Sequence, residues 1–132
     1  MDEAVIKYYR KLLKTGFEHS GSNENAAIFL DTTTERLLIC GNTGDFMQLY
    51  VNIADNKIVD IKYTCVCDPT ANVAVEILCT LVKDKTLEEA VTVKEEALYQ
   101  LLGSNSEELQ KKVRGMVELL KRGIIRYQTT AR

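Results

Sequence analysis

Two alternating segments joined by a short turn constrain the fold of this chain more than any other feature. In residues 46–53 the apolar side chains take every second position: Met47, Leu49, Val51 and Ile53. A second alternating run follows at residues 59–65, and the residues between the runs, Ala54-Asp55-Asn56-Lys57, have the composition of a tight turn. A period of two puts alternate side chains on one face of a β-strand. The sequence therefore predicts an antiparallel hairpin with one buried face.

Helix signals lie on both sides of this hairpin. Apolar residues recur at steps of three and four from Val5 to Leu13, which predicts an amphipathic helix that Gly16 ends. After the hairpin, Asp68 is a candidate N-cap and Pro69 fits the first helical position, so a largely buried helix is expected as far as Val82.

The last third of the chain has the composition of a helical region. A Ser or Thr stands three residues before a Glu at three places, and each pair predicts a helix start: Thr86/Glu89, Thr92/Glu95 and Ser104/Glu107. Two further strands are expected at residues 26–30 and 35–40. The fold class predicted is α+β, a small antiparallel meander packed against several helices in a single domain over residues 1–132.

Composition excludes several classes of protein. A formal net charge of -2 gives no overall attraction to nucleic acid or to a membrane. The N-terminus has no secretory pattern, so the protein is expected to be cytoplasmic, with its four cysteines reduced. His19, the only histidine, lies in a polar segment and is expected at the surface. No Walker loop, dinucleotide fingerprint or His-Glu-x-x-His motif occurs, and the chain is not predicted to be an enzyme.

The cysteines suggest a metal-thiolate site. Cys65 and Cys67 are two residues apart, so in a strand both side chains face the same way and can share a metal, or form a strained disulfide after a local bend. The N-terminus of the following helix should lower the pKa of the Cys67 thiol. Cys79 is flanked by Leu78 and Leu81 and is expected in the core, and core packing is the alternative for Cys40.

Two stretches of sequence carry a family resemblance. Residues 44–51 read Gly-Asp-Phe-Met-Gln-Leu-Tyr-Val, and residues 82–90 read Val-Lys-Asp-Lys-Thr-Leu-Glu-Glu-Ala. With Asp60 between them, they resemble the Cys-Gly-Asp turn, the following strand and the Val-Lys-Gly-Lys-Ser-Leu-Asp-Glu-Ala segment of NifU/IscU-type iron-sulfur cluster scaffold domains. The resemblance covers nearly the whole chain.

In that family three cysteines and an acid hold a nascent cluster or a zinc ion, since thiolates are soft ligands and the acid permits ligand exchange. Here Thr43 stands at the first cysteine position and Asp68 at the second, while the family's His-Cys pair falls near Arg114-Gly115. Only Asp45 keeps its register. The resemblance also implies that Arg114 repels a metal ion or pairs with Asp45 or Asp68.

Neighbouring cysteines offer a substitute ligand set. Cys40 opens a turn that is three residues longer than the family's, and Cys67 is one residue from the second ligand position. The candidate ligands of an iron-sulfur cluster, iron or zinc are therefore Cys40, Asp45, Cys65 and Cys67. Of these four residues, Cys40, Asp45 and Cys67 are the expected ligands of a cluster, and Cys65 is a candidate persulfide acceptor.

The resemblance implies a function with two alternatives. The first is a scaffold of iron-sulfur cluster assembly that binds iron or a nascent cluster transiently. The alternative is a degenerate, non-metal-binding interaction module, and a sulfur-transfer protein using Cys65 or Cys67 alone is a third hypothesis. The partners implied are a cysteine desulfurase and other assembly proteins, with the chain a monomer or weak homodimer.

Overall fold

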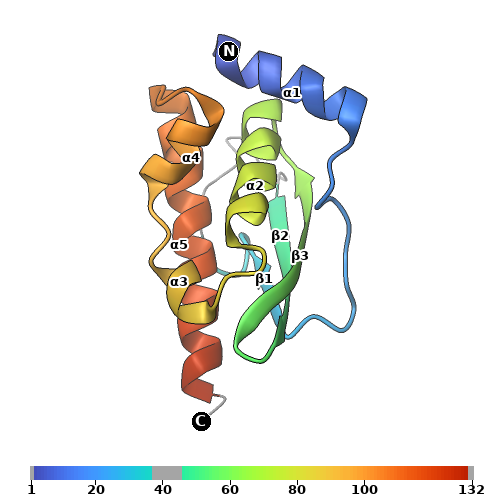
Figure 1. The fold of residues 1–132 in the computed structure, drawn as a ribbon, viewed down its shortest axis with the longest axis vertical. Helices are drawn as coiled ribbons and strands as arrows, with labels where there is room; N and C mark the ends of the chain where they lie inside the picture. Colours follow the sequence, from blue (N-terminus) through green and yellow to red (C-terminus); the bar gives the residue numbers. More distant parts are fainter. Residues whose placement is uncertain (1, 37–45, 131–132) are drawn as a thin grey trace.

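The sheet is antiparallel and lies on one side of a group of helices (Figure 1). The computed structural model describes residues 2–36 and 46–130. Its strands are β1 (Ile28–Asp31), β2 (Phe46–Ala54) and β3 (Lys57–Val66), in the order β1-β2-β3. The helices are α1 (Glu3–Thr15), α2 (Pro69–Val82), α3 (Leu87–Val91), α4 (Glu95–Leu102) and α5 (Glu107–Thr130). The predicted α+β class is confirmed.

The predicted hairpin is confirmed as β2 and β3. Leu49 faces Tyr63 and Met47 faces Cys65 across the ladder, and the side chains of Met47 and Leu49 are fully buried. At the turn, Asp55 and Asn56 both have positive φ, 53° and 63°. Two such residues suit the right-handed twist of a hairpin, and Asp and Asn accept this conformation more readily than most residues.

Helices α2 and α5 cover the apolar face of the sheet (Figure 1). Ten of the fourteen residues of α2 are buried, as its mostly apolar composition predicts. Helix α5 passes so close to β1 that a Cβ added to Gly123 would lie 2.6 Å from both δ-carbons of Leu30. The absence of a side chain at Gly123 therefore permits this close approach of the helix to the sheet.

Two of the three predicted helix starts differ in the structure. Thr86 and Glu89 form the expected capping box before α3. Thr92, however, ends α3, because its backbone N–H bonds back to that helix, and α4 begins at Glu95 without a side-chain cap. At α5 the hydroxyl that accepts the Leu109 N–H belongs to Ser106 and not to Ser104. The hydroxyl of Ser104 instead bonds Asp2, the cap of α1.

The first two residues of the strand predicted at residues 35–40 do not form a strand. Glu35 and Arg36 lie in a turn after β1, and the remaining four residues lie outside the described part of the chain. The carboxylate of Glu35 accepts hydrogen bonds from both terminal nitrogens of Arg126, at 2.7 and 3.3 Å. This pairing draws Glu35 toward α5 and away from a continuing strand.

His19 is buried, contrary to the prediction of a surface position, with a relative exposure of 3%. Its backbone N–H and the Tyr63 hydroxyl both donate to Oε1 of Glu76, each at 3.1 Å. Ser20 also forms an isolated parallel β-bridge with Tyr63 of β3. His19 can be buried within this polar segment because a carboxylate on α2 accepts its backbone N–H, a contact that a sequence pattern does not reveal.

The buried phenol of Tyr63 predicts a loss of stability in alkali. Burial, and next the charge of Glu76, raise the pKa of Tyr63 far above its usual value of 10.0. Above about pH 10 the unfolded chain releases this proton while the folded chain keeps it, so the free energy of unfolding should fall by up to about 1.4 kcal/mol per pH unit. Urea unfolding between pH 9 and 11 measures this slope.

Tyr63→Phe should reduce the slope, whereas Tyr50→Phe, on the opposite face of the sheet, should leave it unchanged. Part of the slope should survive in Tyr63→Phe, because burial also raises the pKa of the Cys79 thiol. Equal slopes in Tyr63→Phe and in the unaltered protein would contradict the prediction.

Candidate metal-thiolate site

The candidate site lies at the corner where β3 turns into α2. Strand β3 ends at Val66, Cys67 follows, and Asp68 caps the helix that begins at Pro69. Asp68 has extended dihedrals, φ −78° and ψ 168°, as expected for a residue before proline. The corner therefore brings Cys65, Cys67 and Asp68 next to the N-terminus of a buried helix.

The two sulfur atoms are half-buried and close to the start of β2. Both Cys65 and Cys67 pack against the core, and Cys65 lies opposite Met47 in the ladder. The Sγ of Cys67 is 3.4 Å from the carbonyl oxygen of Phe46. Cys67 is disulfide-bonded in this structure, contrary to the expectation that all four cysteines are reduced, so metal ligation requires its reduced form.

Asp68 uses both carboxylate oxygens. Oδ1 accepts the backbone N–H of Ala71 at 2.9 Å, which confirms the predicted N-cap. Oδ2 lies 3.0 Å from the ammonium nitrogen of Lys112 on α5. The side chain of Lys112 is 10% exposed and that of Asp68 39%. Asp68 thus holds α2 to α5 through a partly buried ion pair.

Lys112, and not Arg114, is the cation at this corner. Of the two alternatives for Arg114, repulsion of a metal ion or pairing with Asp45 or Asp68, the pairing with Asp68 is not observed: the side chain of Arg114 is 71% exposed, and its Nε lies 3.5 Å from Oε1 of Glu95. Asp45 lies outside the described residues. The physical reason is helical periodicity: Lys112 is three residues after Leu109 and four before Met116, so it shares their buried face. A lysine within an apolar stripe is the sequence signal that could have identified this residue.

A second polar contact joins the same two helices. The hydroxyl of Thr70, in the first turn of α2, donates to Oε1 of Glu108 at 3.3 Å. Glu108 is one turn before Lys112 on α5, so both residues face the beginning of α2. These contacts fix α5 against the corner that carries the sulfur atoms.

The electrostatics of the corner favour bound anions. The N-terminus of α2 carries a partial positive charge, and the charge of Lys112 is paired with that of Asp68. A positive potential at a helix N-terminus stabilises bound anions, and the thiolate is the form of cysteine that binds iron and zinc. The arrangement is therefore suited to hold thiolates, with a carboxylate already paired to a cation beside them.

The structure describes only part of the predicted ligand set. Cys65 and Cys67 are both at the corner, while Cys40 and Asp45 lie outside the described residues. Within residues 2–36 and 46–130, no three His, Cys, Asp or Glu side chains are grouped closely enough to hold a metal ion. Cys79 is fully buried in α2, which confirms its predicted place in the core.

Comparison with known proteins places residues 17–132 in one family model, the NifU-like N terminal domain. The chain is 29% identical over 84 residues to the iron-sulfur cluster assembly scaffold proteins IscU 1 and IscU 2 of Archaeoglobus fulgidus. The match covers 64% of this chain and 55% of each relative, so the chain spans about half the length of these curated relatives.

Solved structures share the fold at low sequence identity. The N-terminal part of a NifU-like protein from Brucella abortus superposes with a TM-score of 0.63 at 9% identity, covering 97% of this chain and 94% of that one. A protein from Fervidobacterium islandicum, described as an assembly scaffold for the SUF system, gives 0.52 at 20% identity, covering 97% and 86%. These similarities support the fold alone.

The ion pair between Asp68 and Lys112 predicts that removing the charge of Asp68 lowers the free energy of unfolding more than removing the charge of Glu95. Asp68→Asn should lower the free energy of unfolding by about 1–2 kcal/mol, less than the roughly 3–5 kcal/mol of a fully buried pair, because Asp68 is partly exposed. Asp68→Ala should cost about 1 kcal/mol more, since it also removes the helix cap. Urea unfolding at neutral pH provides the measurement.

Glu95→Gln is the matched control, because its partner Arg114 is mostly exposed and such pairs contribute little. In the Lys112→Met background, Asp68→Asn should cost less than in the unaltered protein, because the ion pair between the two residues is already absent. An equal cost for Asp68→Asn and Glu95→Gln would show that the corner ion pair does not stabilise the fold.

Proposed function

Because the chain belongs to the family of NifU-like N-terminal domains, we propose that it is a scaffold that holds iron or a nascent iron-sulfur cluster transiently during assembly. The observation that carries the proposal is the pair of half-buried cysteines, Cys65 and Cys67, beside the N-terminus of α2 and the ammonium group of Lys112. The iron and sulfide are cargo and not a resident cofactor.

Cys67 is the proposed ligand nearest to the position of the family's second cysteine. Asp68 occupies that position itself, but its two oxygens are engaged by Ala71 and Lys112. Cys40 and Asp45, which precede β2 in the sequence, are the proposed further ligands. Cys65, two residues before Cys67, is proposed as an additional ligand or as the acceptor of a persulfide sulfur.

Lys112 supports this function through charge. Thiolates bound to iron add negative charge to a cluster, and a nearby ammonium group stabilises that charge without occupying a coordination position. Asp68 orients Lys112 toward the corner. Lys112 therefore acts through its charge and not as a metal ligand.

The proposed scaffold does not turn over a substrate. It acts with partner proteins that deliver sulfur and receive the cluster. A cysteine desulfurase and other assembly proteins in the cytoplasm are the partners proposed. The named relatives are assembly scaffolds, which favours this function over an interaction module that carries no metal.

Anaerobic reconstitution with ferrous iron and sulfide, in the presence of dithiothreitol, tests the proposal. The reduced protein should develop sulfide-to-iron charge-transfer absorption and retain iron and acid-labile sulfide after desalting. Cys67→Ala should lose most of the bound iron, because it removes the thiolate at the helix N-terminus. Cys40→Ala and Asp45→Ala should also lower the iron content.

Cys79→Ala is the matched control, since it removes a cysteine that is fully buried in the core and away from the corner. It should retain the iron content of the unaltered protein. Reconstitution that gives no chromophore, or an equal loss in Cys67→Ala and Cys79→Ala, would refute the proposed site and favour the interaction module.

A further inference from the structure

Helix α1 carries four cations on one exposed side. Lys7, Arg10, Lys11 and Lys14 are all exposed and follow the spacing i, i+3, i+4 and i+7, which places them on one side of the helix. Glu3 is the only acid in α1. The helix therefore has a net charge of +3, which leaves −5 for the rest of a chain whose total is −2.

The described fold does not neutralise these cations. None of the four forms an ion pair with another residue within 2–36 and 46–130. By contrast, the arginines of α5 do form ion pairs, with Glu95, Glu118 and Glu35. Like charges three or four residues apart destabilise a helix, so the cluster on α1 works against the stability of α1.

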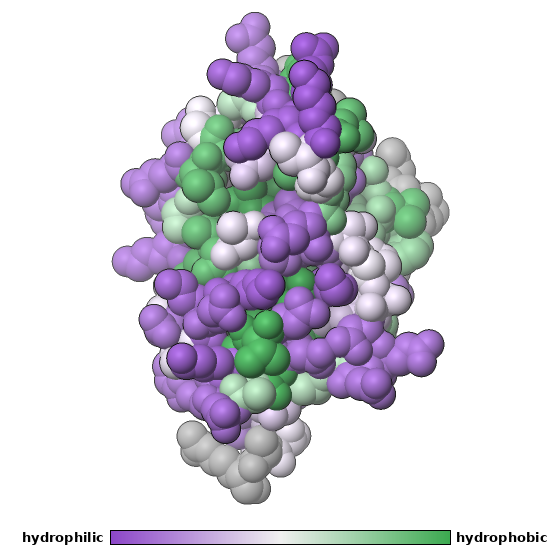
Figure 2. All heavy atoms as spheres, turned by 45° about the vertical axis from the view of Figure 1, so that its right-hand side comes forward, coloured by the Kyte–Doolittle hydropathy of each residue, from purple (hydrophilic) through white to green (hydrophobic). Residues whose placement is uncertain are grey.

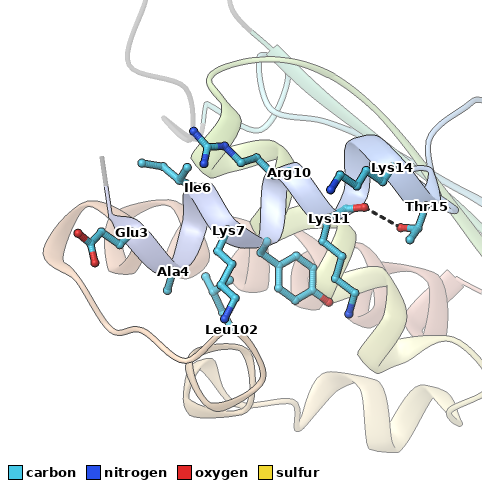
Figure 3. Close-up of a pocket in the computed structure, with 10 residues that line it drawn as sticks. Glu3, Ala4, Ile6, Lys7, Arg10, Lys11, Lys14, Thr15 and Leu102 are labelled. Carbon is cyan, nitrogen blue, oxygen red and sulfur yellow. Dashed lines mark hydrogen bonds between the residues drawn. The ribbon is translucent and has the colours of Figure 1, made fainter.

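A groove runs beside the cations (Figure 3). Its volume is about 1040 Å³, and it is lined by α1 and by Leu102, the last residue of α4. Within this exposed side of α1, Lys7 and Lys11 lie nearer to Leu102, and Arg10 and Ile6 lie farther from it (Figure 3). The ammonium group of Lys11 is 5.5 Å from the ring centroid of Tyr8, which also lines the groove.

Apolar surface is thus recessed beneath a rim of positive charge. Leu102 is only 7% exposed, whereas the lysines extend into solvent. Figure 2 shows hydrophilic side chains projecting from the end of the molecule where α1 lies, with hydrophobic surface between them. A flat lipid surface meets the lysines before it meets Leu102, while a polypeptide side chain can enter the groove.

We propose that α1 and Leu102 form a docking site for an acidic segment of a partner protein. The carboxylates of that segment pair with the four cations, and one apolar side chain lies over Tyr8 and Leu102. Pairing removes the repulsion along α1 and gives the complementary potentials typical of specific interfaces. This inference does not rest on iron or cluster binding, and its test uses neither.

Fluorescence anisotropy of a fluorescein-labelled glutamate peptide with one central leucine, titrated with the full chain, tests the proposal. The Kd should rise at least about tenfold, equivalent to about 1.4 kcal/mol, in Lys7→Glu/Lys11→Glu. The matched control is Lys111→Glu/Lys121→Glu on α5, which changes the net charge equally and should leave the Kd nearly unchanged. Binding should also weaken with added salt, because the cations are exposed.

Circular dichroism establishes that each variant is folded, and Lys7→Gln/Lys11→Gln replaces the charge reversal if it is not. Equal weakening in the α1 and α5 variants would overturn the proposal, because it indicates attraction to net charge alone. Absence of peptide binding would also overturn it. Tighter binding to phosphatidylglycerol vesicles than to the peptide, lost on the same α1 substitutions, would assign the surface to lipid instead.

Discussion

Burial of helix α2 on nearly all sides is the constraint on which the other elements depend. Ten of its fourteen residues are buried, so it requires the sheet on one side and α5 on the other. Its polar residues are satisfied within that environment: Glu76 by His19 and Tyr63, and Thr70 by Glu108. The same helix begins at the corner with β3, so its N-terminus lies beside the end of that strand. The position of the candidate site follows from the way the core is built.

Charge is distributed differently on the two helices that flank this core. The arginines of α5 are paired with carboxylates from other turns and other elements, and Lys112 is drawn into the corner by Asp68. Each of these cations has a carboxylate partner within the protein. The cations of α1 have no such partners among the described residues, and they lie beside a groove with an apolar floor. The arginines and Lys112 of α5 are therefore paired within the protein, whereas the cations of α1 present their charge to solvent.

Local patterns predicted most of the regular structure, and the exceptions have physical causes. The predictions of the hairpin, of the helix capped by Asp68 and of the capping box at Thr86 were correct because each depends on neighbouring residues. The pattern at Thr92 failed because the same sequence suits the end of one helix as well as the start of another. The surface position predicted for His19 was wrong because its burial depends on Glu76, a residue 57 positions away. Of the candidate site, sequence placed Cys65, Cys67 and Asp68 together at a helix start, and it missed Lys112.

The sequence by itself determined the period of each strand and helix, the cap at Asp68 and the nearness of two cysteines to it, because these depend on interactions over a few residues. Only the tertiary structure decided which cation faces the corner and how closely α5 approaches the sheet. Arg114 and Lys112 are two residues apart, yet the rotation of α5 in the core turns one to solvent and the other to Asp68. The distance between α5 and β1 likewise depends on the contact between Gly123 and Leu30, which no local pattern specifies. Helix rotation and helix approach are fixed by packing over the whole core, and so they lie beyond the reach of a local pattern.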